Sequence, residues 1–182
     1  PPILVYSILS GDSSYIEKLT MSMPPSQLGT AYLNFIASHD GIGLRPAESF
    51  LSQNEIEKFI NHMEKNGGKI SYRSNNTNTP EPYEINISLM DAMKESFDKE
   101  SKLYLKRFIC VHTIMFSLEG VPAIYIHSLF GSSNDYDLFK ITKQNRSLNR
   151  GKIKVSEIMK SDHPNEHHTI FNEIKNLIKI RK

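Results

Sequence analysis

The feature that most constrains the fold is a pattern that occurs twice along the chain. A short apolar segment ends in polar residues and is followed by a long loop and then by an amphipathic helix. The apolar segments are YLNFIAS, residues 32–38, and GVPAIYIHS, residues 120–128. Apolar strands with little alternation are typical of a parallel sheet that is buried on both faces. The repeated unit therefore predicts an α/β sheet or barrel, in which ligands bind at the C-terminal ends of the strands.

Other elements are predicted from apolar periodicity and from glycine, proline and capping residues. Residues 69–74 and 83–88 read as strands on either side of a polar turn. Residues 129–152 form a long polar segment that is predicted to be a loop, and loops of this length are usually functional. Helices are expected over residues 2–10, 14–20, 55–66, 88–97, 103–120 and 163–182.

Two parallel strands cannot bury both faces of a sheet without further elements. We therefore expect residues 1–182 to be the C-terminal part of a larger (β/α)8 TIM barrel, supplying its last two or so strand–helix units. Residues 41–100 are predicted to be a loop or subdomain inserted after the first of these strands. The absence of an initiator methionine before Pro1 agrees with a piece of a longer protein.

Composition disfavours several classes of partner and location. The 22 basic and 20 acidic residues give a formal charge of +2, and the basic residues are spread out, which disfavours nucleic-acid binding. No apolar stretch reaches the roughly 20 residues of a membrane span, and no signal peptide is visible. Cys110 is the single cysteine, which favours a cytoplasmic location. Its apolar neighbours predict a small buried side chain rather than a reactive thiol.

His39 and Asp40 place an imidazole beside a carboxylate directly after the first predicted strand. A carboxylate at this position could stabilise developing positive charge or bind a sugar hydroxyl. Arg45 is close enough in sequence to compensate its charge. The other interpretation is structural: Asp40 would cap a turn and His39 would be a core histidine. The dipeptide alone does not distinguish the two interpretations.

Further polar groups are weaker candidates for site residues. Tyr83 and Glu84 could face a sugar, and Asp135 and Arg146 lie in the long second loop, where Arg146 could bind phosphate or a hydroxyl. From sequence alone, exposure to solvent is the better prediction for these groups. His163, His167 and His168 could suggest a metal, but no cysteine or carboxylate cage accompanies them, so neither a metal nor a cofactor is predicted.

Taken together, the segments FIASHDGIG, PYEIN, GVPAIYIHSLFGSSND and NRSLNR resemble glycoside hydrolase family 13, the α-amylase superfamily, and within it the sucrose phosphorylase-like subfamily. The resemblance covers nearly the whole chain. It implies a retaining (β/α)8-barrel enzyme that transfers glucose from an α-glucoside to inorganic phosphate. In such enzymes an aspartate forms a covalent glucosyl intermediate, a glutamate is the acid/base, and a second aspartate stabilises the transition state.

The resemblance assigns roles to individual residues. It implies that Asp40 is the stabilising aspartate and that His39 binds glucose hydroxyls beside it. Tyr83 and Glu84 match the acceptor loop, and Arg146 matches an arginine that pairs with glucose and with the stabilising aspartate; Asp135 is a further candidate contact. The motifs of the nucleophile and of the acid/base are missing, so the chain alone is expected to be inactive.

Two alternatives remain open at this point. The parent enzyme could be a hydrolase or transglucosidase of the same family rather than a phosphorylase. The chain could also be a noncatalytic sugar-binding module, or one that self-associates through exposed barrel edges.

Overall fold

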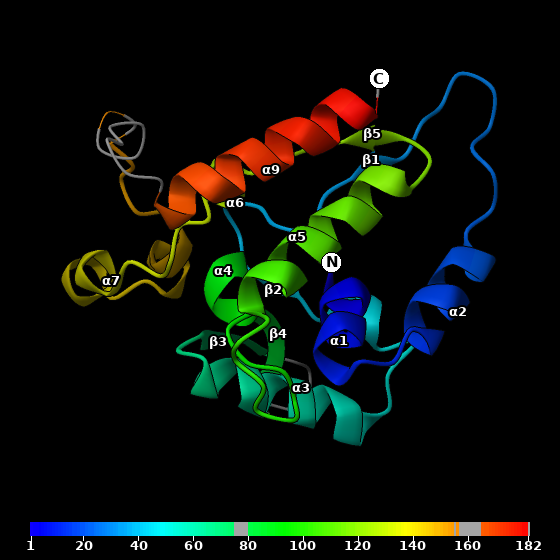
Figure 1. The fold of residues 1–182 in the computed structure, drawn as a ribbon. Coiled ribbons are helices and arrows are strands. Elements are labelled where there is room, and N and C mark those ends of the chain that lie inside the picture. The colour runs from blue at the N-terminus through cyan, green and yellow to red at the C-terminus, as the bar shows by residue number, and fades with distance from the viewer. Residues whose placement is uncertain (75–79, 155, 157–164, 182) are drawn as a thin grey trace.

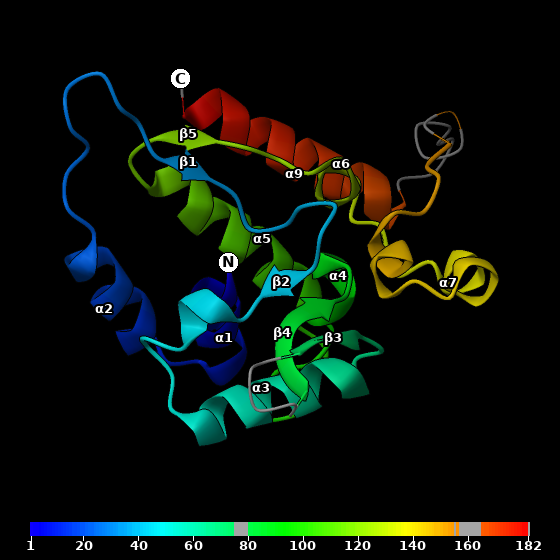
Figure 2. The same ribbon diagram turned by 180° about the vertical axis from the view of Figure 1, so that it is seen from behind.

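The computed structural model describes residues 1–74, 80–154, 156 and 165–181. Figures 1 and 2 show the short β1 and β5 lying against α5 and α9, with these two helices on one side of them. The helices are α1 (Pro2–Ser10), α2 (Ser14–Ser22), α3 (Gln53–Lys65), α4 (Leu89–Ala92), α5 (Tyr104–Ser117), α6 (Ile126–Leu129), α7 (Tyr136–Thr142) and α9 (Glu166–Ile180). The strands are β1 (Leu33–Asn34), β2 (Ile42–Gly43), β3 (Lys69–Ser74), β4 (Pro80–Asn86) and β5 (Val121–Pro122), with 3-10 turns η1 (Arg45–Ala47) and η2 (Asn145–Asn149).

β1 and β5 pair in parallel, with Leu33 opposite Val121. This is the pairing expected for the two apolar segments, but each strand is much shorter than predicted. Among the described residues, β1 and β5 have only each other as neighbours in their sheet. The ladder ends with the N–H of Ala123, which donates to the carbonyl oxygen of Asn34 at 2.7 Å, and the chain then turns into α6 where the sequence predicted strand.

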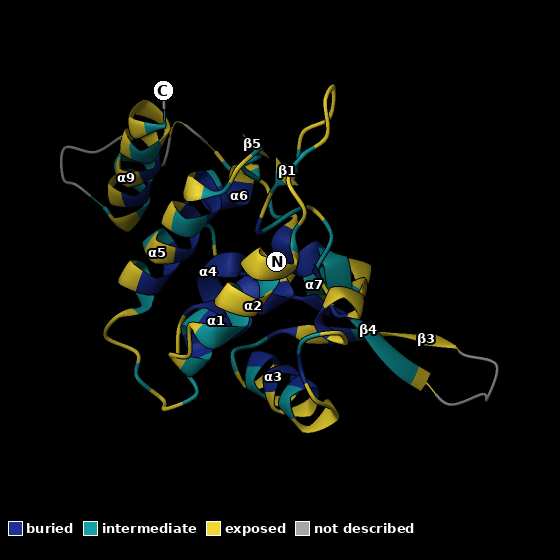
Figure 3. Cartoon of the chain, turned by 90° about the vertical axis from the view of Figure 1, so that its right-hand side faces the viewer, coloured by how far each residue is buried: buried dark blue, intermediate teal, exposed yellow. Residues whose placement is uncertain are grey.

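A second sheet has the order β2-β4-β3 and is antiparallel throughout. It lies within residues 41–100, the segment predicted to be an insertion, and includes both strands predicted around the polar turn. Residues 75–79 of that turn lie outside the described part of the chain. Figure 3 shows that the outer part of β3 is exposed, while the inner end of β4 is buried.

Most helices follow their predicted ranges because their apolar residues face one core. Nearly every residue of α1 is buried, which agrees with a helix that is apolar on all sides. α3 begins with a capping box in which Ser52 and Glu55 satisfy each other's backbone N–H groups. Ile170 and Ile174 of α9 are fully buried, and this helix packs on α5.

Three local predictions were wrong. The helix expected over residues 88–97 is only the short α4. The segment 129–152 is not all loop, because Asp135 caps α7 and η2 follows. Cys110 is exposed on α5 rather than buried, since the buried side of this helix carries Phe108, Val111 and Met115.

Candidate functional site

The candidate site is built around the loop that follows β1 and carries His39 and Asp40. The loop crosses over β4, and Gly41 makes this close approach possible. A Cβ atom on Gly41 would lie 2.3 Å from the carbonyl oxygen of Ile85 and 2.7 Å from the side-chain Nδ2 of Asn86. Glycine at this position thus lets the Asp40 backbone rest directly on the second sheet.

Asp40 forms ion pairs with two arginines, Arg146 within η2 and Arg150 directly after it. Its Oδ1 lies 2.9 Å from Nη1 of Arg146 and 3.2 Å from Nη2 of Arg150. His39, with a side chain that is 69% exposed, approaches the same oxygen at 3.7 Å. Arg45, which the sequence suggested as the compensating cation, is exposed in η1 and is not among the ion-pair partners of Asp40. The 3-10 turn and the residue that ends it therefore bring two arginines to a carboxylate more than 100 residues away in sequence.

Arg150 also fixes the backbone of this loop. Its Nε donates a hydrogen bond of 2.8 Å to the carbonyl oxygen of His39. The guanidinium thus contacts both the main chain before Asp40 and the Asp40 carboxylate. An arginine can do this because its donors have a fixed planar arrangement, which a lysine lacks.

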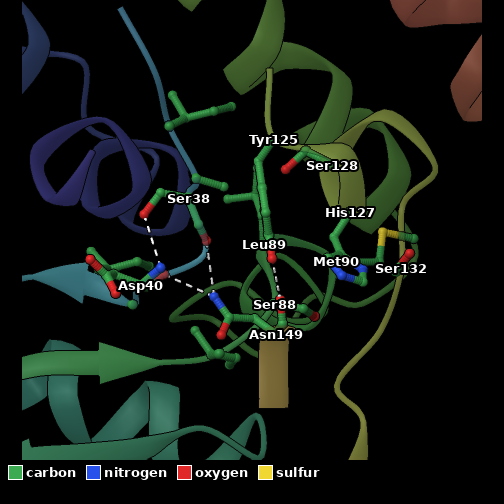
Figure 4. A pocket seen from close by; sticks show the side chains of 15 residues that line it. Ser38, Asp40, Ser88, Leu89, Met90, Tyr125, His127, Ser128, Ser132 and Asn149 are labelled. Carbon is green, nitrogen blue, oxygen red and sulfur yellow. Dashed lines mark hydrogen bonds between the residues drawn. The ribbon is translucent and has the colours of Figure 1, made fainter. Parts of the chain in front are cut away.

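Asn149 supports the loop from below, as Figure 4 shows. Its Nδ2 donates to the carbonyl oxygens of Ser38 at 3.0 Å and Asp40 at 2.8 Å. The side chain is buried, and its Oδ1 has no hydrogen-bond partner among the described residues. A small cavity of about 20 Å³ lies beside it, bounded also by Ser38, Ser88 and Tyr125.

Glu84 on β4 is buried, whereas the sequence alone favoured a surface position. Its carboxylate accepts from Nε and Nη2 of Arg146, at 3.0 and 2.8 Å, and from Nδ2 of Asn86 at 2.5 Å. Burial would raise the pKa of Glu84, but the hydrogen bonds from Arg146 and Asn86 outweigh it and lower the pKa of this carboxyl. The same contact raises the pKa of Arg146. Both groups are therefore charged at neutral pH.

The other predicted site residues lie at varying distances from this cluster. Tyr83 is half-buried, and its carbonyl oxygen accepts from the N–H of Leu44 at 2.9 Å. Asp135 uses Oδ1 to cap α7 through the N–H of Leu138 and borders a separate groove near His127. The structure thus groups His39, Asp40, Glu84 and Arg146, and it assigns Asp135 a capping contact.

The described residues contain no group of three His, Cys, Asp or Glu side chains that could hold a metal ion. His167 uses Nδ1 in a 2.7 Å contact with the carbonyl oxygen of Phe130, and His163 lies outside the described residues. Within the described residues, no helix has the length and apolar character needed to cross a membrane.

Sequence reasoning missed two members of the cluster, Asn149 and Arg150. The segment NRSLNR contains both of them as well as Arg146. Two arginines four residues apart in a polar segment were the available signal. Sequence spacing could not show that a 3-10 turn would direct both arginines towards Asp40.

Comparisons with known proteins agree with the resemblance inferred from the sequence. No family model matches the chain. The chain is 34% identical over 186 residues to a glucosylglycerate phosphorylase of Escherichia coli (strain K12), covering all of this chain and 33% of the relative. It is 27% identical over 162 residues to a sucrose phosphorylase of Streptococcus mutans, covering 88% of this chain and 31% of that protein.

A solved structure shows the same fold. The crystal structure of sucrose 6F-phosphate phosphorylase from Thermoanaerobacter thermosaccharolyticum matches with a TM-score of 0.79 at 18% identity, over 98% of this chain and 34% of that one. The chain thus spans about a third of the length of the relatives it matches. Its homologues are glucosylglycerate and sucrose phosphorylases of glycoside hydrolase family 13, and its fold corresponds to part of a TIM barrel.

Proposed function

We propose that this homologue of the glucosylglycerate and sucrose phosphorylases is the C-terminal part of the catalytic barrel of a retaining phosphorylase. The whole enzyme would move a glucosyl group from an α-glucoside to inorganic phosphate through a covalent glucosyl-enzyme. The observation that carries the proposal is the position of Asp40. Its carboxylate follows a parallel strand and lies between the guanidinium groups of Arg146 and Arg150.

The geometry suits stabilisation of a positively charged transition state. Glycosyl transfer passes through an oxocarbenium-like centre, which a fixed carboxylate stabilises. The contacts of Asp40 with His39, Arg146 and Arg150 involve Oδ1, and we assign Oδ2 to the glucosyl group. The exposed imidazole of His39 would bind sugar hydroxyls, and the guanidinium groups would bind hydroxyls or phosphate.

The two reacting carboxylates would come from other strands of the barrel. The acidic residues of this chain are poor substitutes for them. Asp91 is fully buried and ion-paired with Lys94, and Glu119 accepts a hydrogen bond from Ser26. The chain alone is therefore expected to be inactive, while a protein that also contains the remaining strands would be active.

Glucosylglycerate is the first substrate to test. The glucosylglycerate phosphorylase of Escherichia coli is 34% identical to this chain, compared with 27% for the sucrose phosphorylase of Streptococcus mutans. Tyr83, on the strand beside the Asp40 loop, is proposed to contact the leaving group or phosphate. A cytoplasmic location belongs to this proposal and is supported by the single cysteine.

Product analysis of the longer protein that contains this chain tests the proposal. With glucosylglycerate or sucrose and phosphate, α-glucose 1-phosphate should form. The variant Asp40→Asn should lower kcat/KM by about 100-fold or more, whereas Asp137→Asn, at an exposed carboxylate on α7, should leave it unchanged. Release of free glucose with or without phosphate, and no glucose 1-phosphate, would support a hydrolase instead.

A second candidate function, self-association, is supported by apolar residues around the short parallel sheet. Leu33 and Val121, which face each other in that sheet, are 64% and 56% exposed, and Phe35 is 41% exposed. Exposed apolar strands with free edges favour association between copies of a chain. Sedimentation of the chain over a range of concentrations tests this: a single monomeric species throughout would exclude it.

A further inference from the structure

We infer that Glu84 is a positioning residue for Arg146 and that it does not contact the glucosyl group itself. The inference rests on the proposed function and deepens it. The resemblance to the phosphorylases placed Glu84 with Tyr83 among residues that face the substrate. The contacts of the Glu84 carboxylate, its burial and the arrangement of the Arg146 guanidinium lead to a different role.

The carboxylate of Glu84 is buried and most of its acceptor sites are taken by protein donors. Oε1 accepts from Nε of Arg146 and from Nδ2 of Asn86, and Oε2 accepts from Nη2 of Arg146. These bonds occupy three of the about four lone-pair sites of a carboxylate. The side chain is also only 7% exposed.

Arg146 lies between this buried carboxylate and the more exposed one of Asp40. One edge of its guanidinium, Nε and Nη2, binds Glu84 in a bidentate manner, and Nη1 at the other end contacts Asp40. The Arg146 side chain is 41% exposed and that of Asp40 is 39% exposed. The bidentate contact therefore fixes which end of the guanidinium is presented to Asp40 and to solvent.

In this arrangement Arg146 presents a single nitrogen, Nη1, to Oδ1 of Asp40. Without Glu84, the flexible arginine side chain could turn the edge that now binds Glu84 towards Asp40. Arginine and carboxylate groups prefer such bidentate pairs. Asp40 Oδ2 would then be engaged by Arg146 rather than left for the glucosyl group. By binding this edge of the guanidinium, Glu84 thus prevents Arg146 from neutralising the Asp40 carboxylate.

The net charge of the cluster around Asp40 also supports a positioning role for Glu84. Glu84 and Asp40 carry two negative charges, and Arg146 and Arg150 carry two positive charges, so the cluster is neutral. Loss of the Glu84 charge leaves an excess positive charge beside the position where positive charge develops in the reaction. Such an excess would oppose the transition state, because it repels the oxocarbenium-like centre.

A double-mutant cycle in the longer, active protein tests the inference. Glu84→Gln should lower kcat/KM by about 10- to 100-fold, the range for a lost charge-assisted hydrogen bond. In an Arg146→Met background the same change should cost less than about 3-fold, because the arginine through which Glu84 acts, with its charge and its donors, is already gone. Equal losses in both backgrounds would show that Glu84 contacts substrate or acts independently of Arg146, and would overturn the inference.

The control is Glu81→Gln on the same strand. Glu81 pairs with Arg73 through an exposed contact of 3.0 Å. This variant should keep the wild-type kcat/KM. A loss equal to that of Glu84→Gln would mean that any lost carboxylate on β4 disturbs the site, and would overturn the specific role of Glu84.

A second measurement does not depend on activity. The Nε–H of Arg146, hydrogen-bonded to buried Glu84, should give a slowly exchanging nitrogen–proton NMR signal that becomes fast-exchanging in Glu84→Gln and stays slow in Glu81→Gln. Fast exchange in the wild type would overturn the inference. If the signal behaves as expected but the longer protein forms no glucose 1-phosphate, the proposed function fails while the contact between Glu84 and Arg146 stands.

Discussion

Arg150 donates a hydrogen bond of 2.8 Å to the backbone carbonyl oxygen of His39, a residue 111 positions earlier in the chain. This contact joins the end of η2 to the loop after β1. Because the same guanidinium pairs with Asp40, one side chain contributes both to the position of the loop and to the charge of the site.

Arg150→Lys should separate these two effects. Lysine keeps the positive charge but cannot donate to His39 and Asp40 from a rigid fork. In the longer protein, we expect kcat/KM to fall by about 10-fold, the cost of roughly one lost hydrogen bond to a charged donor. Arg45→Lys, at the exposed arginine that is not paired with Asp40, is the matched control and should be neutral. Equal effects of the two changes would contradict the role assigned to Arg150.

Gly41→Ala should displace the Asp40 loop. The new Cβ would approach the carbonyl oxygen of Ile85 to 2.3 Å, so the backbone must move. We expect a loss of unfolding free energy of about 1–3 kcal/mol, typical of overpacking, measured by urea denaturation. Gly43→Ala, two residues later, meets no atom within 4 Å and should be tolerated. If both variants were equally stable, the close approach of this loop to β4 would be wrong.

Asn149→Asp should destabilise the chain because it replaces a donor with a second acceptor. The two carbonyl oxygens of Ser38 and Asp40 would then face a buried carboxylate. We expect unfolding free energy to fall by about 3 kcal/mol. Chemical denaturation measures this loss, and the control is Asn61→Asp, the same change at an exposed position of α3. A loss below that of the control would show that the amide does not support the loop.

His112 should make stability depend on pH. Burial lowers the pKa of this imidazole to about 4, although the hydrogen bond with Phe108 partly opposes the shift. Between the ordinary value of 6.5 and about 4, the unfolded chain binds a proton that the native chain does not. Stability should therefore be full above pH 6.5 and fall as the pH decreases through this window, by at most about 1.4 kcal/mol per pH unit.

The variant His112→Asn isolates this contribution. It removes the titrating group, so the difference in unfolding free energy between wild type and variant should shrink as the pH falls from 7 to 5. Urea denaturation at the two pH values measures the difference. A difference that stays constant over this range would show that His112 is not buried in its neutral form.

The sequence predicted the elements that local chemistry controls. Apolar periodicity located α3, α5 and α9 to within a few residues, because each buries one face in the core. It also identified the two parallel strands, but not their length. Strand length depends on pairing with neighbours, and β1 and β5 have only one another in the described part of the chain.

By itself the sequence determined that the chain is part of an α/β barrel with His39 and Asp40 after a strand, because residue type and spacing are local properties. Only the tertiary structure decided which groups surround Asp40. Arg146 and Arg150 reach it from a 3-10 turn, and Glu84 turns from a predicted surface residue into a buried partner of Arg146. These contacts join segments 62 to 111 residues apart, and such pairings depend on how the segments pack rather than on their local sequence.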